Sequence, residues 1–212
     1  MTAPLFIIGA GGFGREVFGI IDALESSGRG PHTTRFIDDD TSVADLDYVD
    51  ALGSRVVGSV DDLVRRTEPF NAVLAIGSRI ARGDIAGRRA HSPVTLAVLV
   101  HPDTTIGCNV RLAEDVVVAA GSRLSINNQA GKHVHLDQDA LVGRDCSLGD
   151  CSRLNPQAFV SGAVTIGRRA LIGANATVLQ GITARDDAIV DAGAVVSHQV
   201  ETAKTGMGVS AR

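Results

Sequence analysis

The chain has 212 residues, of which 44% are hydrophobic, 3% are aromatic and 21% are charged, and its formal net charge is −4. This length suggests one or two domains, and a mean hydropathy of +0.16 argues against disorder. No basic block points to a nucleic-acid partner, and no apolar run approaches the ~20 residues that span a bilayer. We therefore expect neither partner, no signal peptide, and a cytoplasmic protein.

Strand and helix patterns alternate over residues 1–95, which predicts a small parallel α/β domain of Rossmann-like type. Strands are expected at residues 4–9, 36–38, 56–58, 72–76 and 96–100. Helices are expected from the first glycine turn to residues 26–28, and over residues 60–66 and 79–90. Residues 38–50 are acidic and lack periodicity, so we expect a loop there.

Residues 9–14 read Gly-Ala-Gly-Gly-Phe-Gly, a G-x-G-x-x-G turn between an expected strand and an expected helix. Asp38 and Asp39 follow the next strand. This pattern predicts that the backbone approaches a phosphate at a helix N-terminus. It is typical of NAD sites, but the domain stops at about five strands and no domain for hydride transfer follows. The alternative is that the glycines only turn the chain.

An apolar residue recurs every six positions from Ile106 to Val196. All sixteen positions are apolar, fourteen are Ile, Leu or Val, and Gly follows directly at six of the first fifteen. A fixed short period indicates a solenoid, here with one short strand and one corner per hexad. Three sides close a coil of eighteen residues, so fifteen hexads predict about five coils. We assign residues 96–200 to this β-helix and residues 201–212 to a C-terminal tail.

The glycine turn, the Asp38-Asp39 pair, His101-Pro102 at the junction and the hexads together resemble the sialic-acid O-acetyltransferase-like family. This family of hexapeptide-repeat acyltransferases includes nucleotide-amino-sugar N-acetyltransferases. The resemblance implies a left-handed parallel β-helix and a homotrimer with active sites between neighbouring prisms. It also implies acetyl-CoA or another acyl-CoA as co-substrate, with no permanently bound cofactor. The acyl group would pass to an amino or hydroxyl group of a small-molecule substrate, a nucleotide sugar or related metabolite.

The same resemblance assigns residues to two binding regions. Those expected to bind the nucleotide sugar are Gly9, Gly11, Gly12, Phe13, Gly14, Arg15, Asp38, Asp39, Gly77, Ser78 and Arg79. Those expected to bind acyl-CoA are Gly162, Gly173, Ala174 and Gly208. Residues 208–211 read Gly-Val-Ser-Ala where the family has Gly-x-Pro-Ala.

The family's catalytic tripeptide, Glu-His-Asp, aligns with Gly143, Arg144 and Asp145, and its second histidine aligns with Arg153. In the family the first histidine is the general base. Arginine has a pKa above ~12 and cannot act as a base near neutral pH. The residue that accepts the proton must therefore lie elsewhere, if acyl transfer is retained.

His133 and His135 occupy the hexad before this motif. A coil of eighteen residues places His135 below Arg153 and His133 below Cys151. We predict a catalytic site made of His135, Arg144, Asp145 and Arg153, with Asp137 or Asp139 orienting a histidine. The alternative is that both histidines are exposed polar residues.

Three other interpretations remain open. γ-Type carbonic anhydrases bind zinc through three histidines on neighbouring coils, but no third histidine stands at coil spacing, so no metal is expected. A repurposed hexapeptide-fold protein would bind an anionic metabolite through Arg144 and Arg153, or run different chemistry, without acetyl transfer. Transfer to an acceptor that is already nucleophilic would need little base assistance. The three cysteines lack metal-ligand spacing, and Cys146 is predicted to be a packed thiol.

Overall fold

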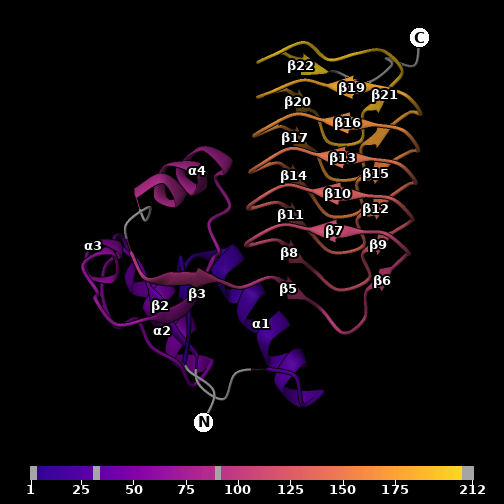
Figure 1. Cartoon of the computed structure of the whole chain (residues 1–212). Coiled ribbons are helices and arrows are strands. Elements are labelled where there is room, and N and C mark those ends of the chain that lie inside the picture. The colour runs from indigo at the N-terminus through magenta and orange to yellow at the C-terminus, as the bar shows by residue number, and fades with distance from the viewer. Residues whose placement is uncertain (1–3, 31–33, 89–91, 207–212) are drawn as a thin grey trace. The chain divides into compact units, whose positions relative to one another are not determined.

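The computed structural model describes residues 4–30, 34–88 and 92–206. The chain divides into two compact units, residues 1–99 and residues 100–212 (Figure 1). The first is an α/β unit with a parallel sheet, and the second is a parallel β-solenoid of about 6 turns. The predicted fold class is confirmed.

The sheet of the first unit has the strand order β2-β1-β3-β4, and every neighbouring pair is parallel. Its strands are β1 (Leu5–Ile8), β2 (Thr34–Ile37), β3 (Phe70–Leu74) and β4 (Val94–Leu96). Its helices are α1 (Gly12–Ser26), α2 (Val43–Ala51), α3 (Val60–Val64) and α4 (Arg79–Arg88). Phe6, Ile8, Ile37, Ala72 and Leu74 form much of the core of this unit. The central strand β1 is a continuous apolar run, as expected for a parallel sheet that is covered on both faces.

Two sequence predictions in this unit are wrong. Residues 38–50, expected to be a loop, contain most of α2, which begins after Ser42 with the Ser42 hydroxyl accepting the Asp45 N–H at 3.1 Å. Only Val49 of α2 is buried, so the helix has no periodic apolar face from which it could be predicted. The strand expected at residues 56–58 is a single bridge between Val56 and Phe36.

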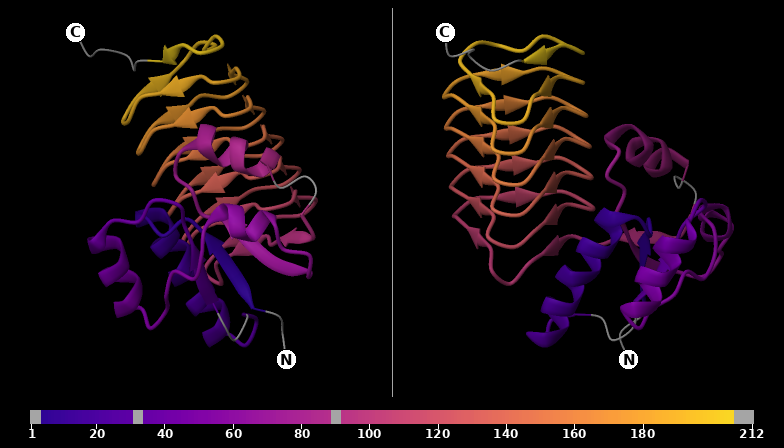
Figure 2. Two further views of the ribbon diagram at one scale, coloured as in Figure 1. Left: turned by 90° about the vertical axis from the view of Figure 1, so that its left-hand side faces the viewer. Right: turned by 180° about the vertical axis from the view of Figure 1, so that it is seen from behind.

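The β-helix has three sides, each a parallel sheet of two-residue strands (Figure 2). The β6 side contains β6 (Thr105–Ile106), β9 (Arg123–Leu124), β12 (Leu141–Val142), β15 (Phe159–Val160), β18 (Thr177–Val178) and β21 (Val195–Val196). The β7 side contains β7 (Arg111–Leu112), β10 (Gln129–Ala130), β13 (Ser147–Leu148), β16 (Thr165–Ile166) and β19 (Thr183–Ala184). The β5 side contains β5 (Leu99–Val100), β8 (Val117–Val118), β11 (His135–Leu136), β14 (Arg153–Leu154), β17 (Leu171–Ile172), β20 (Ile189–Val190) and β22 (Thr205–Gly206).

The hexad residues fill the interior of this unit. Leu136, Leu154 and Ile172 stack in register on the β5 side, and each is at most 1% exposed. The β-helix extends beyond the predicted hexads at both ends. β5 precedes them, and β22, which lies in the segment expected to be a tail, pairs with β20. This explains why about 6 turns are present where the sequence predicted about five.

The corners between sides use the left-handed backbone conformation. Thirteen non-glycine residues have φ between 54° and 62°, and they recur at corner positions of the part of the chain that the structure describes. Asn and Asp are frequent at these positions, as expected because they tolerate positive φ better than other side chains. His133 and Cys151 also have this conformation, and both residues are buried.

Candidate functional site

The glycine turn of the α/β unit combines two structural glycines with two open ones. Gly9 has φ of 113°, and a Cβ at Gly14 would lie 1.9 Å from the Gly9 carbonyl oxygen. Both must be glycine for α1 to pack against the end of β1. A Cβ at Gly11 or Gly12 would meet nothing within 4 Å. The absence of side chains at these two positions therefore leaves space at the start of α1 and is not needed for packing.

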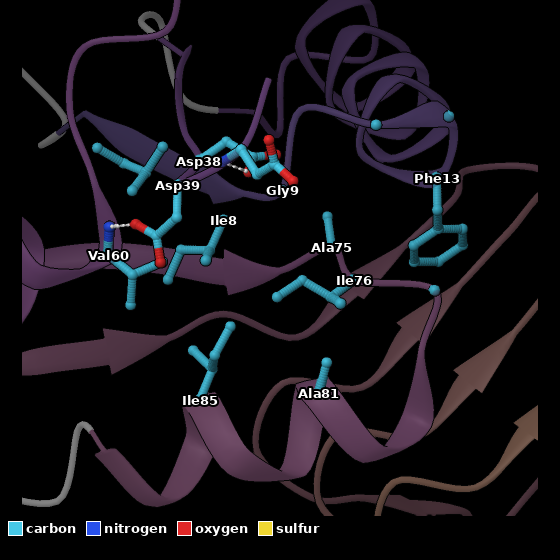
Figure 3. A pocket seen from close by; sticks show the side chains of 15 residues that line it. Ile8, Gly9, Phe13, Asp38, Asp39, Val60, Ala75, Ile76, Ala81 and Ile85 are labelled. Carbon is cyan, nitrogen blue, oxygen red and sulfur yellow. Dashed lines mark hydrogen bonds between the residues drawn. The ribbon is translucent and has the colours of Figure 1, made fainter. Parts of the chain in front are cut away.

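A pocket of about 440 Å³ lies at the carboxyl ends of the strands, where this turn begins α1 (Figure 3). Gly11 caps α1 with its backbone, and no side chain caps the helix. Open helix N-termini bind anions through backbone N–H groups and the helix dipole. The pocket is lined by Ile8, Gly9, Gly11, Gly12, Phe13, Ile37, Asp38, Asp39, Asp40, Val60, Ala75, Ile76, Gly77, Ala81 and Ile85.

The two aspartates after β2 have different roles. Asp38 accepts the Ala10 N–H at 2.6 Å through one oxygen and the Asp40 N–H at 3.0 Å through the other, so it holds the glycine turn in shape. Asp39 accepts the Val60 N–H at 2.7 Å through Oδ1. Figure 3 shows the Asp39 carboxylate between Val60 and Ile8, inside the ring of lining residues. Its second oxygen is placed to accept a hydrogen bond from a ligand.

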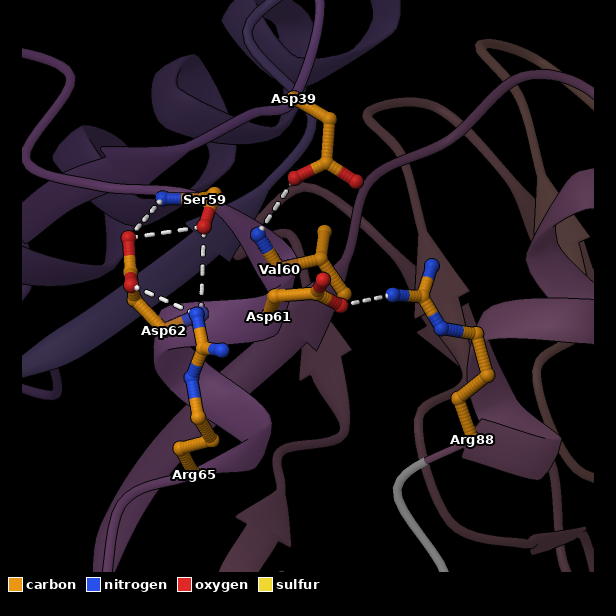
Figure 4. A network of polar contacts seen from close by, with 7 residues as sticks. All are labelled: Asp39, Ser59, Val60, Asp61, Asp62, Arg65 and Arg88. Carbon is orange, nitrogen blue, oxygen red and sulfur yellow. Dashed lines mark hydrogen bonds and ion pairs between the residues drawn. The ribbon is translucent and has the colours of Figure 1, made fainter.

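The Asp39 contact joins a polar network around α3 (Figure 4). Ser59 and Asp62 form a capping box, in which each side chain accepts the other residue's backbone N–H. Arg65 pairs with Asp62, and Arg88 of α4 pairs with Asp61. The network fixes the start of α3, and with it the position of Asp39.

Four residues expected at the nucleotide, Gly14, Arg15, Ser78 and Arg79, do not line this pocket. Arg15 donates to the Ala10 carbonyl at 3.0 Å and to Asp45 at 2.6 Å, so it connects the glycine turn to α2. Its guanidinium also lies 4.7 Å from the centre of the Tyr48 ring. The Ser78 hydroxyl accepts the Ala81 N–H at 3.3 Å and caps α4, whose first residue is Arg79.

Sequence reasoning missed Arg82 at this pocket. Its side chain is fully buried and donates to the Ile76 carbonyl at 2.7 Å, which supports the segment after β3. An arginine within a polar helix gives no sequence signal that it will be buried.

In the β-helix, Arg144 and Asp145 lie at the corner between β12 and β13. Arg144 donates to Asp145 at 3.0 Å, and the other Asp145 oxygen accepts from Asn127 at 2.8 Å. Asn127 in turn accepts from Asn109 at 3.0 Å, one coil further. Hydrogen bonding from Asn127, followed by that from Arg144, lowers the pKa of Asp145 below its ordinary value. A Cβ at Gly162 would lie 3.3 Å from the Arg144 side chain, so the missing side chain at Gly162 leaves room for Arg144 to pack against the next coil.

Arg153 lies on the β5 side and is also paired with a carboxylate. Its Nε and one terminal nitrogen donate to the same Asp137 oxygen at 2.9 and 2.7 Å. Asp137 is buried, and the fully buried His135 is paired in register with Arg153. Both arginines are therefore matched by aspartates, which disfavours the alternative in which Arg144 and Arg153 together hold an anionic metabolite.

The acid that contacts a histidine is Asp115, which sequence reasoning did not select. The Nδ1 atom of His133 lies 2.8 Å from a carboxylate oxygen of Asp115, at the corner between β10 and β11. The side chains are 7% and 0% exposed, respectively. Asp115 lies eighteen residues, or one coil, before His133, so the coil period would have allowed this contact to be predicted from the sequence. Asp137, which was expected to orient a histidine, forms an ion pair with Arg153 through one of its oxygens.

The predicted catalytic residues separate into two groups. Arg144 and Asp145 are at the corner between the β6 and β7 sides, whereas His135 and Arg153 are on the β5 side. One chain therefore does not bring all four side chains together.

The residues expected at acyl-CoA have structural environments of their own. A Cβ at Gly173 would lie 2.5 Å from the Ala192 nitrogen, so this glycine permits the coils to stack. The Ala174 carbonyl accepts the Gly193 N–H at 2.8 Å, which also joins two coils. Gly208 lies outside the described residues.

Cys146 is a packed thiol, as predicted. Its Sγ lies 3.0 Å from the Ser161 carbonyl oxygen, and burial raises the pKa of the thiol. Within residues 4–30, 34–88 and 92–206, no group of three or more His, Cys, Asp or Glu side chains could hold a metal ion. Among the same residues, no helix is long and apolar enough to cross a membrane.

The chain is similar to acetyltransferases of the hexapeptide-repeat type. Residues 4–88 match the PglD N-terminal domain, and residues 163–198 match the hexapeptide repeat of succinyl-transferase. The chain is homologous to perosamine and other nucleotide-amino-sugar N-acetyltransferases, which confirms the resemblance.

Three relatives carry this assignment. A GDP-perosamine N-acetyltransferase of Escherichia coli O157:H7 is 25% identical over 183 residues, which cover 84% of this chain and 79% of that protein. PerB from Caulobacter crescentus, solved with CoA and GDP-perosamine, is 29% identical with a TM-score of 0.84, covering 100% of this chain and 97% of that one. The acetyltransferase domain of PglB from Neisseria gonorrhoeae, solved with acetyl coenzyme A, is 27% identical with a TM-score of 0.84, covering 98% and 97%.

Proposed function

We propose that this chain transfers an acetyl group, or another acyl group, from acyl-CoA to the amino group of a nucleotide-linked amino sugar. The observation that supports the proposal is that one chain contains both a pocket at the start of α1 and a hexapeptide β-helix. Gly11 and Gly12 leave room for a diphosphate, and Asp39 offers an acceptor oxygen. Relatives that match nearly the whole chain were solved with CoA and GDP-perosamine, which supports this pairing of substrates.

The reaction forms one bond and breaks another. The amine nitrogen attacks the thioester carbonyl, the carbon–sulfur bond breaks, and CoA leaves as the thiol. The amine loses a proton, which a protein side chain accepts and which finally reaches the sulfur. Arg144 takes the position of the family's base and cannot accept that proton, and we propose that a histidine of the β-helix does so.

The chemistry is proposed to take place between copies of the chain. Arg144 and Asp145 at one corner, and His135 and Arg153 on the β5 side, would meet when the corner of one protomer reaches the β5 side of its neighbour. A column of exposed apolar side chains on the β6 side, made of Leu141, Phe159 and Val195, supports self-association as a homotrimer. Both substrates are cytoplasmic metabolites, so we place the protein in the cytoplasm.

The decisive experiment is transfer by the purified native chain. Acetyl-CoA is mixed with GDP-, UDP- or dTDP-linked amino sugars, and the products are separated and identified by mass spectrometry. An acetylated product with a stoichiometric release of CoA is expected, with the GDP-linked substrate tested first. Matched nucleotide sugars that carry a hydroxyl group in place of the amine distinguish N- from O-transfer. Calorimetry should show saturable acetyl-CoA binding, and its absence in the folded protein would reject the proposal.

A further inference from the structure

We propose that His133, oriented by Asp115, is the general base that accepts the proton from the acceptor amine. This inference rests on the proposed function and names the residue that replaces the missing family histidine. Its starting point is the 2.8 Å contact between Nδ1 of His133 and Oδ2 of Asp115. A carboxylate at one ring nitrogen fixes the tautomer and the ring orientation, and it stabilises the imidazolium that forms when the other nitrogen takes a proton.

The backbone holds the two side chains in register. Asp115 and His133 are at equivalent corner positions of successive coils, with φ of 62° and 60°. The His133 N–H donates to the Glu114 carbonyl at 3.0 Å, which ties the two corners together. A base that is fixed by two rigid coils needs no reorganisation when the reaction begins.

Burial makes a purely structural role costly for this pair. Asp115 is fully buried and His133 nearly so. Burying a carboxylate–imidazole pair costs hydration free energy, and the attraction between the two groups offsets only part of this cost. Apolar residues of similar size often stabilise a fold equally well. Most corner positions of this β-helix carry Asn, Asp, Ala or Gln, so the fold itself does not require histidine.

Two other pairs of opposite charge lie at this corner. Lys132 lies 3.4 Å from Glu114, and Arg169 donates to both oxygens of Asp187 at 2.8 and 2.6 Å. Cys151 occupies the same corner position on the coil between His133 and Arg169. The His133–Asp115 contact differs from these pairs because it contains an imidazole, the side chain most often used as a general base.

His133 is better placed for this role than the predicted His135. His135 is fully buried on a strand next to that of Arg153, so a positive charge formed there would lie close to a second cation. An imidazolium at His133 faces the Asp115 carboxylate instead.

The test compares His133→Asn, Asp115→Asn and His135→Ala with the native chain. Asn tolerates the left-handed backbone at residue 133 but cannot accept a proton. His198→Gln, which changes an exposed histidine, and Lys132→Ala, which changes an exposed side chain at the same corner, are the controls. The measurements are kcat, KM for both substrates, acetyl-CoA affinity and thermal stability. His133→Ala is also assayed with added imidazole.

We expect kcat of His133→Asn to fall at least ~100-fold with acetyl-CoA affinity unchanged, and Asp115→Asn to fall about tenfold. Imidazole should restore part of the rate in His133→Ala, which a merely structural role would not produce. Native kcat in folded His133→Asn would overturn the proposal, as would a loss confined to His135→Ala. Either result leaves the proposed function intact, provided that the native chain transfers. Absence of transfer by the native chain would remove both.

Discussion

An alanine methyl group would have open space at Gly12 but would clash with backbone at Gly14. Substitutions at these two positions can therefore distinguish an effect on ligand binding from an effect on folding. Gly14→Ala brings a Cβ to 1.9 Å from the Gly9 carbonyl, so the turn must shift and we expect a clear loss of thermal stability. Gly12→Ala has open space at the first residue of α1, so stability should be kept or slightly raised. The added methyl would crowd the phosphate, and we expect about tenfold weaker binding of the nucleotide sugar. Calorimetry measures the affinity and thermal melts measure the stability, and unchanged affinity in Gly12→Ala would contradict a phosphate site at this turn.

The pKa of Asp145 reports on the asparagine ladder at its corner. Hydrogen bonding from Asn127 is the largest cause of the lowered pKa, so Asn127→Ala should return the value toward 3.8. A lowered folded pKa means that the ionised carboxylate contributes stability above its unfolded pKa, and that this contribution is lost as the pH falls through the folded pKa. Acid unfolding should therefore begin at a higher pH in the variant.

A carbon-13 NMR titration of the Asp145 carboxyl measures this change directly. Asn109→Ala is the matched control, because Asn109 contacts Asn127 and not Asp145, and its effect should be smaller. An unaltered pKa in Asn127→Ala would show that Arg144 alone holds the carboxylate.

At the residue scale the sequence located the glycine turn, Asp38 and Asp39, because strand, turn and helix signals agreed there. It could not tell that Arg15 pairs with Asp45, since α2 itself was not expected. We expected the orienting acid in the hexad that follows the histidines. Side-chain contacts between coils instead join residues eighteen positions apart, as Asp115 and His133 show.

At the scale of elements, the β-helix was predictable because the inward apolar residue recurs every six positions and is buried in most hexads. The α/β unit was less so, because α2 buries a single side chain and the segment at Val56 forms one bridge. Secondary structure that depends on neighbours more than on its own periodicity leaves little trace in a sequence.

The hexad ladder predicts a steep dependence of stability on inward positions. Leu154 is 0% exposed, and Leu154→Ala should cost about 2–5 kcal/mol, because the narrow interior cannot collapse around the cavity. Leu179 is 40% exposed and provides a matched leucine, for which Leu179→Ala should change stability by about 0.5 kcal/mol or less. Denaturant unfolding of both variants tests the contrast, and equal losses would contradict the assignment of inward and outward positions.

At the scale of the whole molecule, the exposed apolar column on the β6 side predicts self-association. Phe159 is 40% exposed and lies in register between Leu141 and Thr177. Phe159→Lys should lower the mass measured by light scattering from that of a trimer to that of a monomer, because the buried charge has no partner. Transfer should be lost while the nucleotide sugar still binds, since its pocket is within one chain.

Thr165→Lys is the control for this experiment. Residue 165 is an exposed strand position on the β7 side, away from the apolar column. This variant should keep the native mass. A native chain that is monomeric at micromolar concentration would refute the proposal that sites form between copies.

The fold of the second unit repeats every six residues, but its contacts between side chains repeat every eighteen. A deletion of six residues would keep each apolar side chain pointing inward, yet it would rotate everything beyond it by one side of the prism. Asp115 would then no longer meet His133 if the deletion fell between them. A change of length by a whole coil keeps residues eighteen apart on the same side of the prism, whereas a change by one hexad separates such pairs.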